Sequence, residues 1–301
     1  MKPMEIIVQI YTSIQGMVPS VIQLLSQSVL VAIFLRNNTA TQEFEKIKAG
    51  QFNEVLPDLL KSGKMTYTEL YKAKNFLDIA RIADEKYCKN KSFNKDANYD
   101  FDWFMNFYEA VGNVSDEKMQ DLWARILSQE VDEGNSISLK TIDTIKNMRK
   151  SDAELFEKIS AYAVTDGNKC YVPSSKEFLN KYGIQYSDIL LLNEYGMIYN
   201  DATLSFNIVI GEEHRLVLMN NKIAISAKCC NGLAKKLSVG VYPYTSVGNS
   251  INKVLNIYMG DDLFLQFCKI LANNKEFEFK ASRIKSFNNG MLNVEQENLL
   301  L

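Results

Sequence analysis

The sequence predicts a mainly α-helical α+β protein built from three parts. We expect an apolar helix in residues 1–40, a helical module in residues 41–165, and a mixed region of helices and strands in residues 166–301. Two patterns support this division. In the middle of the chain, apolar residues recur every three or four positions, which is the spacing of one helix face. Beyond residue 165, short segments alternate apolar and polar residues between turn signals, which is typical of strands.

The composition is that of a folded protein, with 47% hydrophobic and 23% charged residues. Lys and Arg number 34 and Asp and Glu number 36, for a net charge of -2. Dedicated nucleic-acid-binding proteins usually carry a basic excess, so this balance disfavours a nucleic-acid partner. No glycine-rich phosphate loop and no zinc-protease motif occurs.

The metal-binding and nucleophilic residue types are few. Five cysteines are present, none at zinc-ligand spacing, and reduced thiols in a cytoplasmic protein are the plain interpretation. His214 is the only histidine, in a Gly-Glu-Glu-His segment that is typical of a solvated turn. We therefore predict no catalytic residue, no metal site and no cofactor, and we expect a protein that is not an enzyme.

Residues 6–35 contain no charged residue. Three interpretations remain open: the segment packs on the rest of the chain, assembles with copies of itself, or inserts in a membrane. Gln23 and Gln27 share a polar helix face beside the apolar Val29, and Phe34 belongs to the strongly apolar end. The apolar part is just long enough to span a bilayer, but its polar side chains are costly in lipid. We favour burial in protein, within the chain or between copies.

The helical module is expected to contain several amphipathic helices, each with an apolar face that packs inward. Ser115 is the expected N-cap of the third, and Ser151 with Glu154 is expected to form a capping box at the start of the last. The apolar faces comprise Phe76, Ile79, Ala80 and Ala83; Trp103, Phe104, Phe107 and Tyr108; Met119, Leu122, Trp123, Ile126 and Leu127; Leu139, Ile142, Ile145 and Met148; and Leu155, Phe156, Ile159 and Tyr162.

The most informative stretch is residues 113–130, which read Asn-Val-Ser-Asp-Glu-Lys-Met-Gln-Asp-Leu-Trp-Ala-Arg-Ile-Leu-Ser-Gln-Glu. With Asp102-Trp103 and the segments 138–141 and 151–156, this motif resembles an uncharacterised bacterial family built on a domain of unknown function. The chain is more loosely similar to abortive-infection alpha proteins. The resemblance covers about residues 70–165, and it implies a context of phage defence and mobile elements rather than a reaction.

Charged and aromatic residues within the motif are the candidates for an interaction or structural site: Asp102, Trp103, Trp123, Arg125 and Glu130. Arg125 and Glu130 have two interpretations, a structural ion pair joined by Asp102 or Asp121, or a charged recognition patch. We favour the structural pair, because both residues lie beside a packed helix face.

The C-terminal region has the element order of a winged helix. Two short helices, at 175–182 and 187–196, precede segments that alternate around the turn Gly211-Glu-Glu-His214 as a predicted β-hairpin wing. A Thr245-x-x-Gly248 segment resembles the helix start that often closes such domains.

The residues of this region resist a DNA-binding interpretation. The helix in the position of a recognition helix, residues 186–195, carries Asp188, Asn193 and Glu194 and has no Lys or Arg. Acidic side chains repel phosphates, whereas major-groove readers use cationic or amide side chains. We therefore favour a winged-helix-like module for protein interaction or dimerisation.

These features lead to one main functional hypothesis. We expect a non-catalytic bacterial protein of phage defence or mobile elements, acting as a homo-oligomer and binding a protein partner or a phage component. One alternative is a membrane-inserting abortive-infection effector through residues 6–35, which leaves membrane association of a cytoplasmic protein open. Another is a winged-helix DNA-binding regulator.

Overall fold

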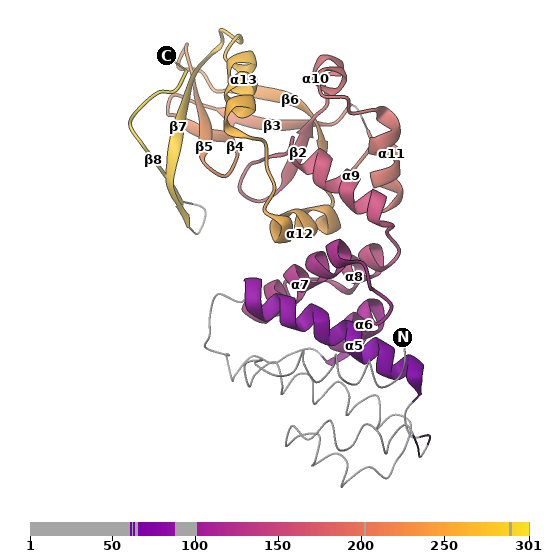
Figure 1. Ribbon diagram of the computed structural model, residues 1–301. Helices are drawn as coiled ribbons and strands as arrows, with labels where there is room; N and C mark the ends of the chain where they lie inside the picture. The colour runs from indigo at the N-terminus through magenta and orange to yellow at the C-terminus, as the bar shows by residue number, and fades with distance from the viewer. Residues whose placement is uncertain are drawn as a thin grey trace. The chain divides into compact units, whose positions relative to one another are not determined.

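The computed structural model describes residues 61, 63, 66–87, 101–201, 203–288 and 291–300. The expected apolar helix, with Gln23, Gln27, Val29 and Phe34, lies outside the described residues. The chain forms two compact units, Met1–Asn147 and Met148–Leu301 (Figure 1). The sequence predicts a boundary after residue 165, whereas the last helix of the predicted helical module lies in the second unit.

The described part of the first unit is helical, as the spacing of its apolar residues predicts. Its elements are α5 (Tyr67–Ile82), the π-helical turn η1 (Ala83–Tyr87), α6 (Phe101–Val111), α7 (Glu117–Asp132) and α8 (Leu139–Lys146). The predicted faces of α5 and α6 are buried and meet at Phe76, whose ring centroid lies 5.7 Å from that of Phe104 and 5.5 Å from that of Tyr108. On α8, Ile142 and Ile145 are buried, whereas Leu139 is exposed.

The helix starts differ in part from the prediction. Asp116, not Ser115, caps α7, since its carboxylate accepts hydrogen bonds from the N–H groups of Lys118 and Met119. The predicted box of Ser151 and Glu154 is also wrong. In α9 (Lys150–Ser160), the carboxylate of Asp152 accepts from the N–H of Arg149. The N-cap of α7 is thus an aspartate, whereas the N-cap of α9 is Arg149, whose N–H is held by the aspartate at the third position of the helix.

The second unit combines an antiparallel sheet with α9 and the four helices α10 to α13. The sheet has the strand order β3-β6-β2-β1-β4-β5-β7-β8. Its strands are β1 (Val164–Thr165), β2 (Cys170–Pro173), β3 (Ser205–Ile210), β4 (Arg215–Met219), β5 (Ile223–Cys229), β6 (Lys235–Pro243), β7 (Phe277–Asn288) and β8 (Met291–Val294). The mixed α and β content confirms the coarse fold class.

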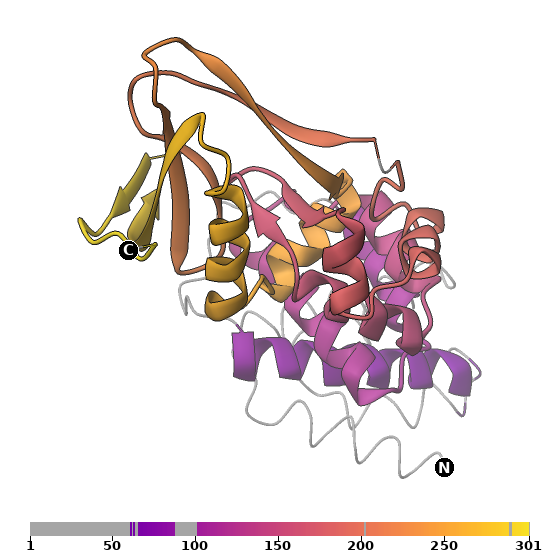
Figure 2. The ribbon, with the colours of Figure 1, turned by 90° about the horizontal axis from the view of Figure 1, so that it is seen from above.

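The strand pairing corrects the predicted wing. β3 pairs with β6, from Ser205 opposite Gly240 to Ile210 opposite Lys235, so the turn after Ile210 does not close a hairpin of β3 and β4. β4 instead pairs with β5, from Arg215 opposite Ala227 to Met219 opposite Ala224. In Figure 2, β3 and β6 form a long ribbon that leads to the β4–β5 hairpin.

Four helices complete the second unit: α10 (Lys176–Lys181), α11 (Tyr186–Glu194), α12 (Ser246–Leu255) and α13 (Asp261–Leu271). The hydroxyl of Thr245 caps α12 by accepting from the N–H of Gly248, as the Thr-x-x-Gly segment predicts. The side-chain position of Gly248 faces the backbone of Met197, so only glycine allows this close approach. α13 packs against β5 and β7. No helix within the described ranges has both the length and the apolar character needed to cross a bilayer.

Candidate functional site

The two candidate tryptophans, Trp103 on α6 and Trp123 on α7, are buried in the core of the first unit. The Trp123 side chain is fully buried, and its ring lies edge-on to Phe107 at a centroid distance of 5.5 Å. Phe107 in turn stacks on Trp103 at 5.1 Å. The two predicted tryptophans are therefore joined through one phenylalanine. Aromatic clusters of this kind contribute mainly by buried area, which gives both residues a structural role.

The two indole N–H groups have different surroundings. That of Trp103 donates to the carbonyl oxygen of Ile137 at 2.7 Å, which fixes the loop before α8 to the start of α6. The buried N–H of Trp123 has no hydrogen-bond partner in the part of the chain that the structure describes. Trp123 is thus held by packing, and its buried N–H is a local cost that the packing must offset.

Glu130 is buried and secures the loop after α7. Its carboxylate accepts hydrogen bonds from the N–H of Asn135 at 2.7 Å and from the N–H of Ile137 at 2.9 Å. Asn135 has a φ of 63°, the left-handed conformation that ends many helices. The predicted ion pair of Glu130 with Arg125 is therefore replaced by a charge-assisted bond to the backbone of a loop.

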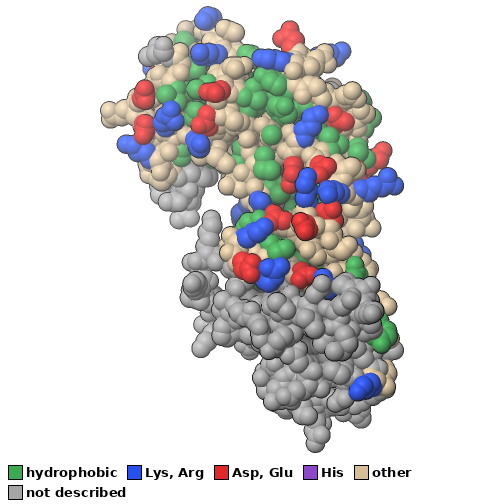
Figure 3. Space-filling view, in the orientation of Figure 1, with side chains coloured by type: hydrophobic (Ala, Val, Ile, Leu, Met, Phe, Trp, Pro, Cys, Tyr) green, Lys and Arg blue, Asp and Glu red, His purple; other side chains and the backbone are tan. Residues whose placement is uncertain are grey.

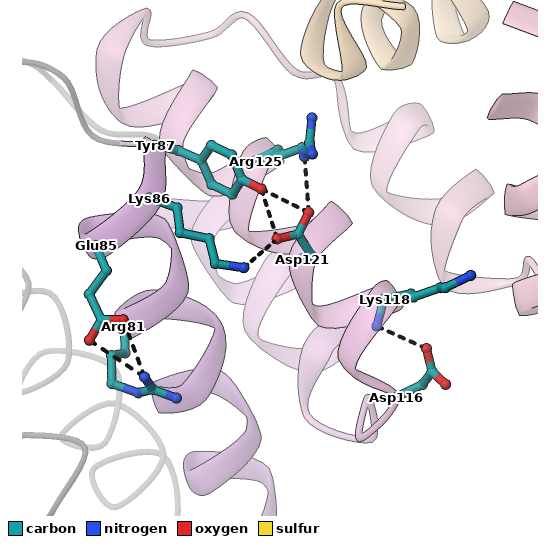
Figure 4. A network of polar contacts seen from close by, with 8 residues as sticks. All are labelled: Arg81, Glu85, Lys86, Tyr87, Asp116, Lys118, Asp121 and Arg125. Carbon is teal, nitrogen blue, oxygen red and sulfur yellow. Dashed lines mark hydrogen bonds and ion pairs between the residues drawn. The ribbon is translucent and has the colours of Figure 1, made fainter. Parts of the chain in front are cut away.

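Arg125 belongs to a polar network that links α7 to the π-helical turn (Figure 4). Its Nε lies 3.1 Å from Oδ2 of Asp121, one helical turn away. The hydroxyl of Tyr87 donates to Oδ1 of the same carboxylate at 2.7 Å, and the Nζ of Lys86 lies 3.1 Å from that Oδ1. The Arg125 guanidinium also lies over the Tyr87 ring, 4.9 Å from its centroid. Of the two aspartates that were expected to join an Arg125–Glu130 pair, Asp121 contacts Arg125, but Glu130 does not take part.

The network shifts the ionisation of its members. Burial acts to raise the pKa of Asp121, but hydrogen bonds from Tyr87, Lys86 and Arg125 outweigh it and lower that pKa. Burial, followed by the bond to Asp121, raises the pKa of Tyr87. The hydrogen bond thus favours the deprotonated carboxylate of Asp121 and the protonated hydroxyl of Tyr87. This mutual compensation suits a structural tie between η1 and α7 better than a site that receives a charged ligand.

Asp102, the remaining predicted residue, is exposed at the start of α6, where its carbonyl oxygen accepts from the side chain of Asn106. The structure thus unites Trp103 with Trp123 in the core. It places Arg125 in the network beside η1, and Glu130 under the next loop. The five residues do not gather at one site. The two tryptophans, Arg125 and Glu130 make contacts that stabilise the fold.

An exposed apolar surface on α11 was not predicted from the sequence. Ile189 and Leu192 face the core, whereas Tyr186 is 53% exposed and Leu190 is 36% exposed. Tyr186 and Leu190 are four residues apart and share the outward face. In the sequence, Tyr186 and Leu190 have the spacing of one helix face, but Ile189 and Leu192 are apolar too. The sequence pattern alone therefore did not show which of the two pairs is buried.

His214 lies near a serine and a carboxylate, the residue types of a catalytic triad. Its Nδ1 is 3.5 Å from Oγ of Ser226, and its Nε2 is 3.8 Å from Glu278. The Ser226 hydroxyl donates instead to the carbonyl oxygen of Lys280, and Glu278 forms an ion pair with Lys228 at 2.9 Å. These distances and competing partners do not make a proton relay. His214 is exposed, as predicted for a turn.

The thiols of the second unit resemble packing residues more than reactive groups. Cys170, Cys229 and Cys268 are buried, and Cys230 is exposed. Burial raises the pKa of Cys170 and of Cys268, which keeps both as neutral thiols. Among the described residues, no cluster of His, Cys, Asp and Glu could hold a metal ion. On the face shown in Figure 3, basic and acidic side chains of the described residues are interspersed.

The chain matches a protein-family model. The family model described as "Protein of unknown function (DUF2806)" matches residues 62–266, about two thirds of the chain. The match includes the motif helix and continues well beyond residue 165, through most of the second unit. No curated protein and no solved structure matches the chain, and the similarity to abortive-infection proteins stays a prediction. The chain belongs to the DUF2806 family of proteins of unknown function.

Proposed function

We propose that this protein is a non-catalytic interaction protein that acts by self-assembly and partner binding in bacterial phage defence or on mobile elements. The context rests on the resemblance of residues 70–165. The mode of action rests on the surface of the second unit. One observation carries it: the outward face of α11 presents Tyr186 and Leu190 to solvent and no Lys or Arg.

The second unit is proposed to be a winged-helix-like module. The element order α9, β2, α10, α11, β3, β6 supports this proposal, as does the three-strand arrangement in which β6 lies between β3 and β2. In this scheme β3 and β6 are the wing strands, and β4 and β5 are inserted between them. α11 then takes the position of a recognition helix.

The side chains of α11 favour a protein over DNA as its partner. Asp188 and Glu194 are the charged residues of the helix, and both are acidic. Phosphates would be repelled there, and the affinity of DNA for proteins depends on cationic contacts. Exposed tyrosine is, in contrast, enriched at protein interfaces and among the residues that contribute most to binding. The geometry therefore supports a protein-binding helix.

Site-specific crosslinking tests this function. A photoreactive amino acid replaces Leu190 on α11, and a second variant carries it at Ile270, a 63% exposed residue on α13. Crosslinked proteins are identified by mass spectrometry from cells with and without phage. We expect a defined protein crosslinked from position 190 and not from position 270. Crosslinks to DNA from position 190, or salt-dependent duplex binding by the purified protein, would contradict the proposal and favour the DNA-binding regulator.

Self-assembly is proposed to depend on residues 6–35. The uncharged character of this segment supports an assembly helix, and bilayer insertion is the competing outcome. Mass photometry and membrane fractionation of the full chain and of a chain beginning at Asn37 separate the two. A soluble oligomer that becomes monomeric on truncation supports assembly. A full chain that sediments with membranes, when the truncated chain does not, would replace assembly with membrane action.

A further inference from the structure

A second tyrosine extends the exposed face of α11 at the end of β6. Tyr199 is 51% exposed, and its N–H donates to the carbonyl oxygen of Pro243 at 2.9 Å. The preceding turn is fixed by the side chain of Asn193, which donates to the carbonyl oxygen of Ile198 at 2.8 Å. The turn that carries Tyr199 is therefore held by bonds to both α11 and β6.

Tyr186 and Leu190 lie on α11, and the side chain of Asn193 on the same helix holds the turn that carries Tyr199. Tyr186, Leu190 and Tyr199 are therefore exposed on α11 and on the turn that follows it. We call these three residues the tyrosine face. Their backbone positions are set by secondary structure, so little ordering is lost when a partner binds.

The segment that carries the tyrosine face has only acidic charged residues. From Tyr182 to His214 the sequence contains no Lys or Arg. Its acidic residues are Asp188, Glu194, Asp201, Glu212 and Glu213. The segment therefore carries a formal charge of -5 within a chain of net charge -2, so the rest of the chain sums to +3.

Two acidic residues, Asp201 and Glu194, follow Leu190 in this segment. Two hydrogen bonds from Thr203 lower the pKa of Asp201, and Glu194 is exposed at the end of α11. The nearest preceding cation, Lys181, is turned to other partners: its Nζ lies 3.3 Å from the Gln266 side chain and over the Tyr182 ring. Negative potential around the tyrosine face is therefore not neutralised by Lys181.

From this arrangement we infer that the tyrosine face binds a basic, amphipathic segment of a protein partner, with an apolar side chain seated between Tyr186 and Leu190. The inference rests on the proposed function and names the chemistry of the partner. Arginine suits this site in two ways: its charge complements the acidic surroundings, and its planar guanidinium stacks on the exposed ring of a tyrosine. Nucleic acids and anionic lipid headgroups are repelled by the same charge.

The probe for this inference is a short helical peptide of leucine and arginine, compared with a counterpart in which every arginine is replaced by glutamate. Binding to the full-length protein is measured by fluorescence anisotropy at low and at physiological salt. We expect the arginine peptide to bind, to weaken with salt, and to bind the double variant Tyr186→Ser, Leu190→Ser about ten-fold more weakly or worse. Ile270→Ser is the matched control and leaves affinity unchanged.

A second variant separates charge from apolar contact. Glu194→Gln keeps the tyrosine face and removes one charge, so it is expected to weaken the arginine peptide chiefly at low salt. Equal binding of the two peptides, or equal loss from Ile270→Ser, overturns the inference. Crosslinking from position 190 to a protein through an acidic or neutral segment overturns it as well, while the proposed function stands. Crosslinking of DNA from that position would contradict both the inference and the proposed function.

Discussion

The two units differ in which of their notable side chains bind the fold and which face solvent. In the first unit the charged residues of the motif are turned toward the fold: Asp121 binds Tyr87 and Arg125, and Glu130 binds the loop after α7. In the second unit α11 leaves Tyr186 and Leu190 in solvent. The difference teaches that the stretch most recognisable in the sequence holds the structure together, whereas the surface that we propose to bind a partner lies elsewhere.

The strongest test of the structural side of this comparison is Trp123→Ala. Removal of the indole from a fully buried position leaves a large cavity, and we expect a loss of about 3–5 kcal/mol of unfolding free energy. Trp103 is the only other tryptophan, so its fluorescence in a urea titration reports the first unit. Trp123→Phe is the control: it loses no hydrogen bond and is expected to cost much less. Equal effects of the two variants would show that cavity volume is not the cause.

Sequence spacing predicted the helices of the first unit well because a helix depends on neighbours three and four residues apart. It failed for the strand partner of β3, which begins at Lys235, after β4 and β5 have intervened. A turn signal after Ile210 is local, and it cannot reveal that a distant strand competes for pairing. The partner of Glu130 was missed for a similar reason, since backbone N–H groups leave no trace in a sequence pattern.

The outward face of α11 shows a further limit. Tyr186, Ile189, Leu190 and Leu192 are all apolar or aromatic, and a nine-residue helix offers few positions from which to infer a buried side. Which pair faces the core depends on α9 and the sheet, elements set by tertiary packing. The acidic character of the segment was, in contrast, readable directly from the sequence, and it is the basis of the prediction that the partner is a protein rather than DNA.

The next largest effect is expected in the second unit, at Gly248. A methyl group there would lie 2.1 Å from the carbonyl oxygen of Met197, which is backbone and cannot rotate away. We expect Gly248→Ala to destabilise the second unit by about 1–3 kcal/mol, measured by hydrogen exchange of the sheet amides. Gly134→Ala is the control, because its methyl group meets nothing within 4 Å. An unchanged exchange pattern in Gly248→Ala would contradict the close approach of α12.

A smaller loss is expected from Glu130→Gln. The amide keeps the shape of the carboxylate but offers only one acceptor oxygen to the N–H groups of Asn135 and Ile137. An unsatisfied buried donor costs about 1–3 kcal/mol, and Trp103 fluorescence in urea measures the change. Glu133→Gln, on the exposed side of the same helix end, should stay within about 0.5 kcal/mol of the parent. Similar losses in both variants would assign the effect to charge rather than to the loop.

The smallest effect is expected at the network beside η1. The pKa of Asp121 is lowered in the folded state, so its contribution is present above the unfolded value of about 3.9 and is lost as pH falls through the folded pKa. Since the network is half-exposed, Asp121→Asn is expected to cost about 1 kcal/mol or less at neutral pH. Urea titrations at neutral pH and below pH 4 should converge for parent and variant as the pH falls. A gap that widens toward low pH would contradict the assigned sign.

The central claim is that the tyrosine face binds a partner and does not hold the fold. The most direct measurement records both the thermal unfolding and the arginine-peptide affinity of the double variant Tyr186→Ser, Leu190→Ser. Since both side chains are exposed, we predict a change in unfolding free energy within about 0.5 kcal/mol, together with the loss of peptide binding. A marked drop in the unfolding temperature, or unchanged peptide affinity in a folded variant, would contradict the claim.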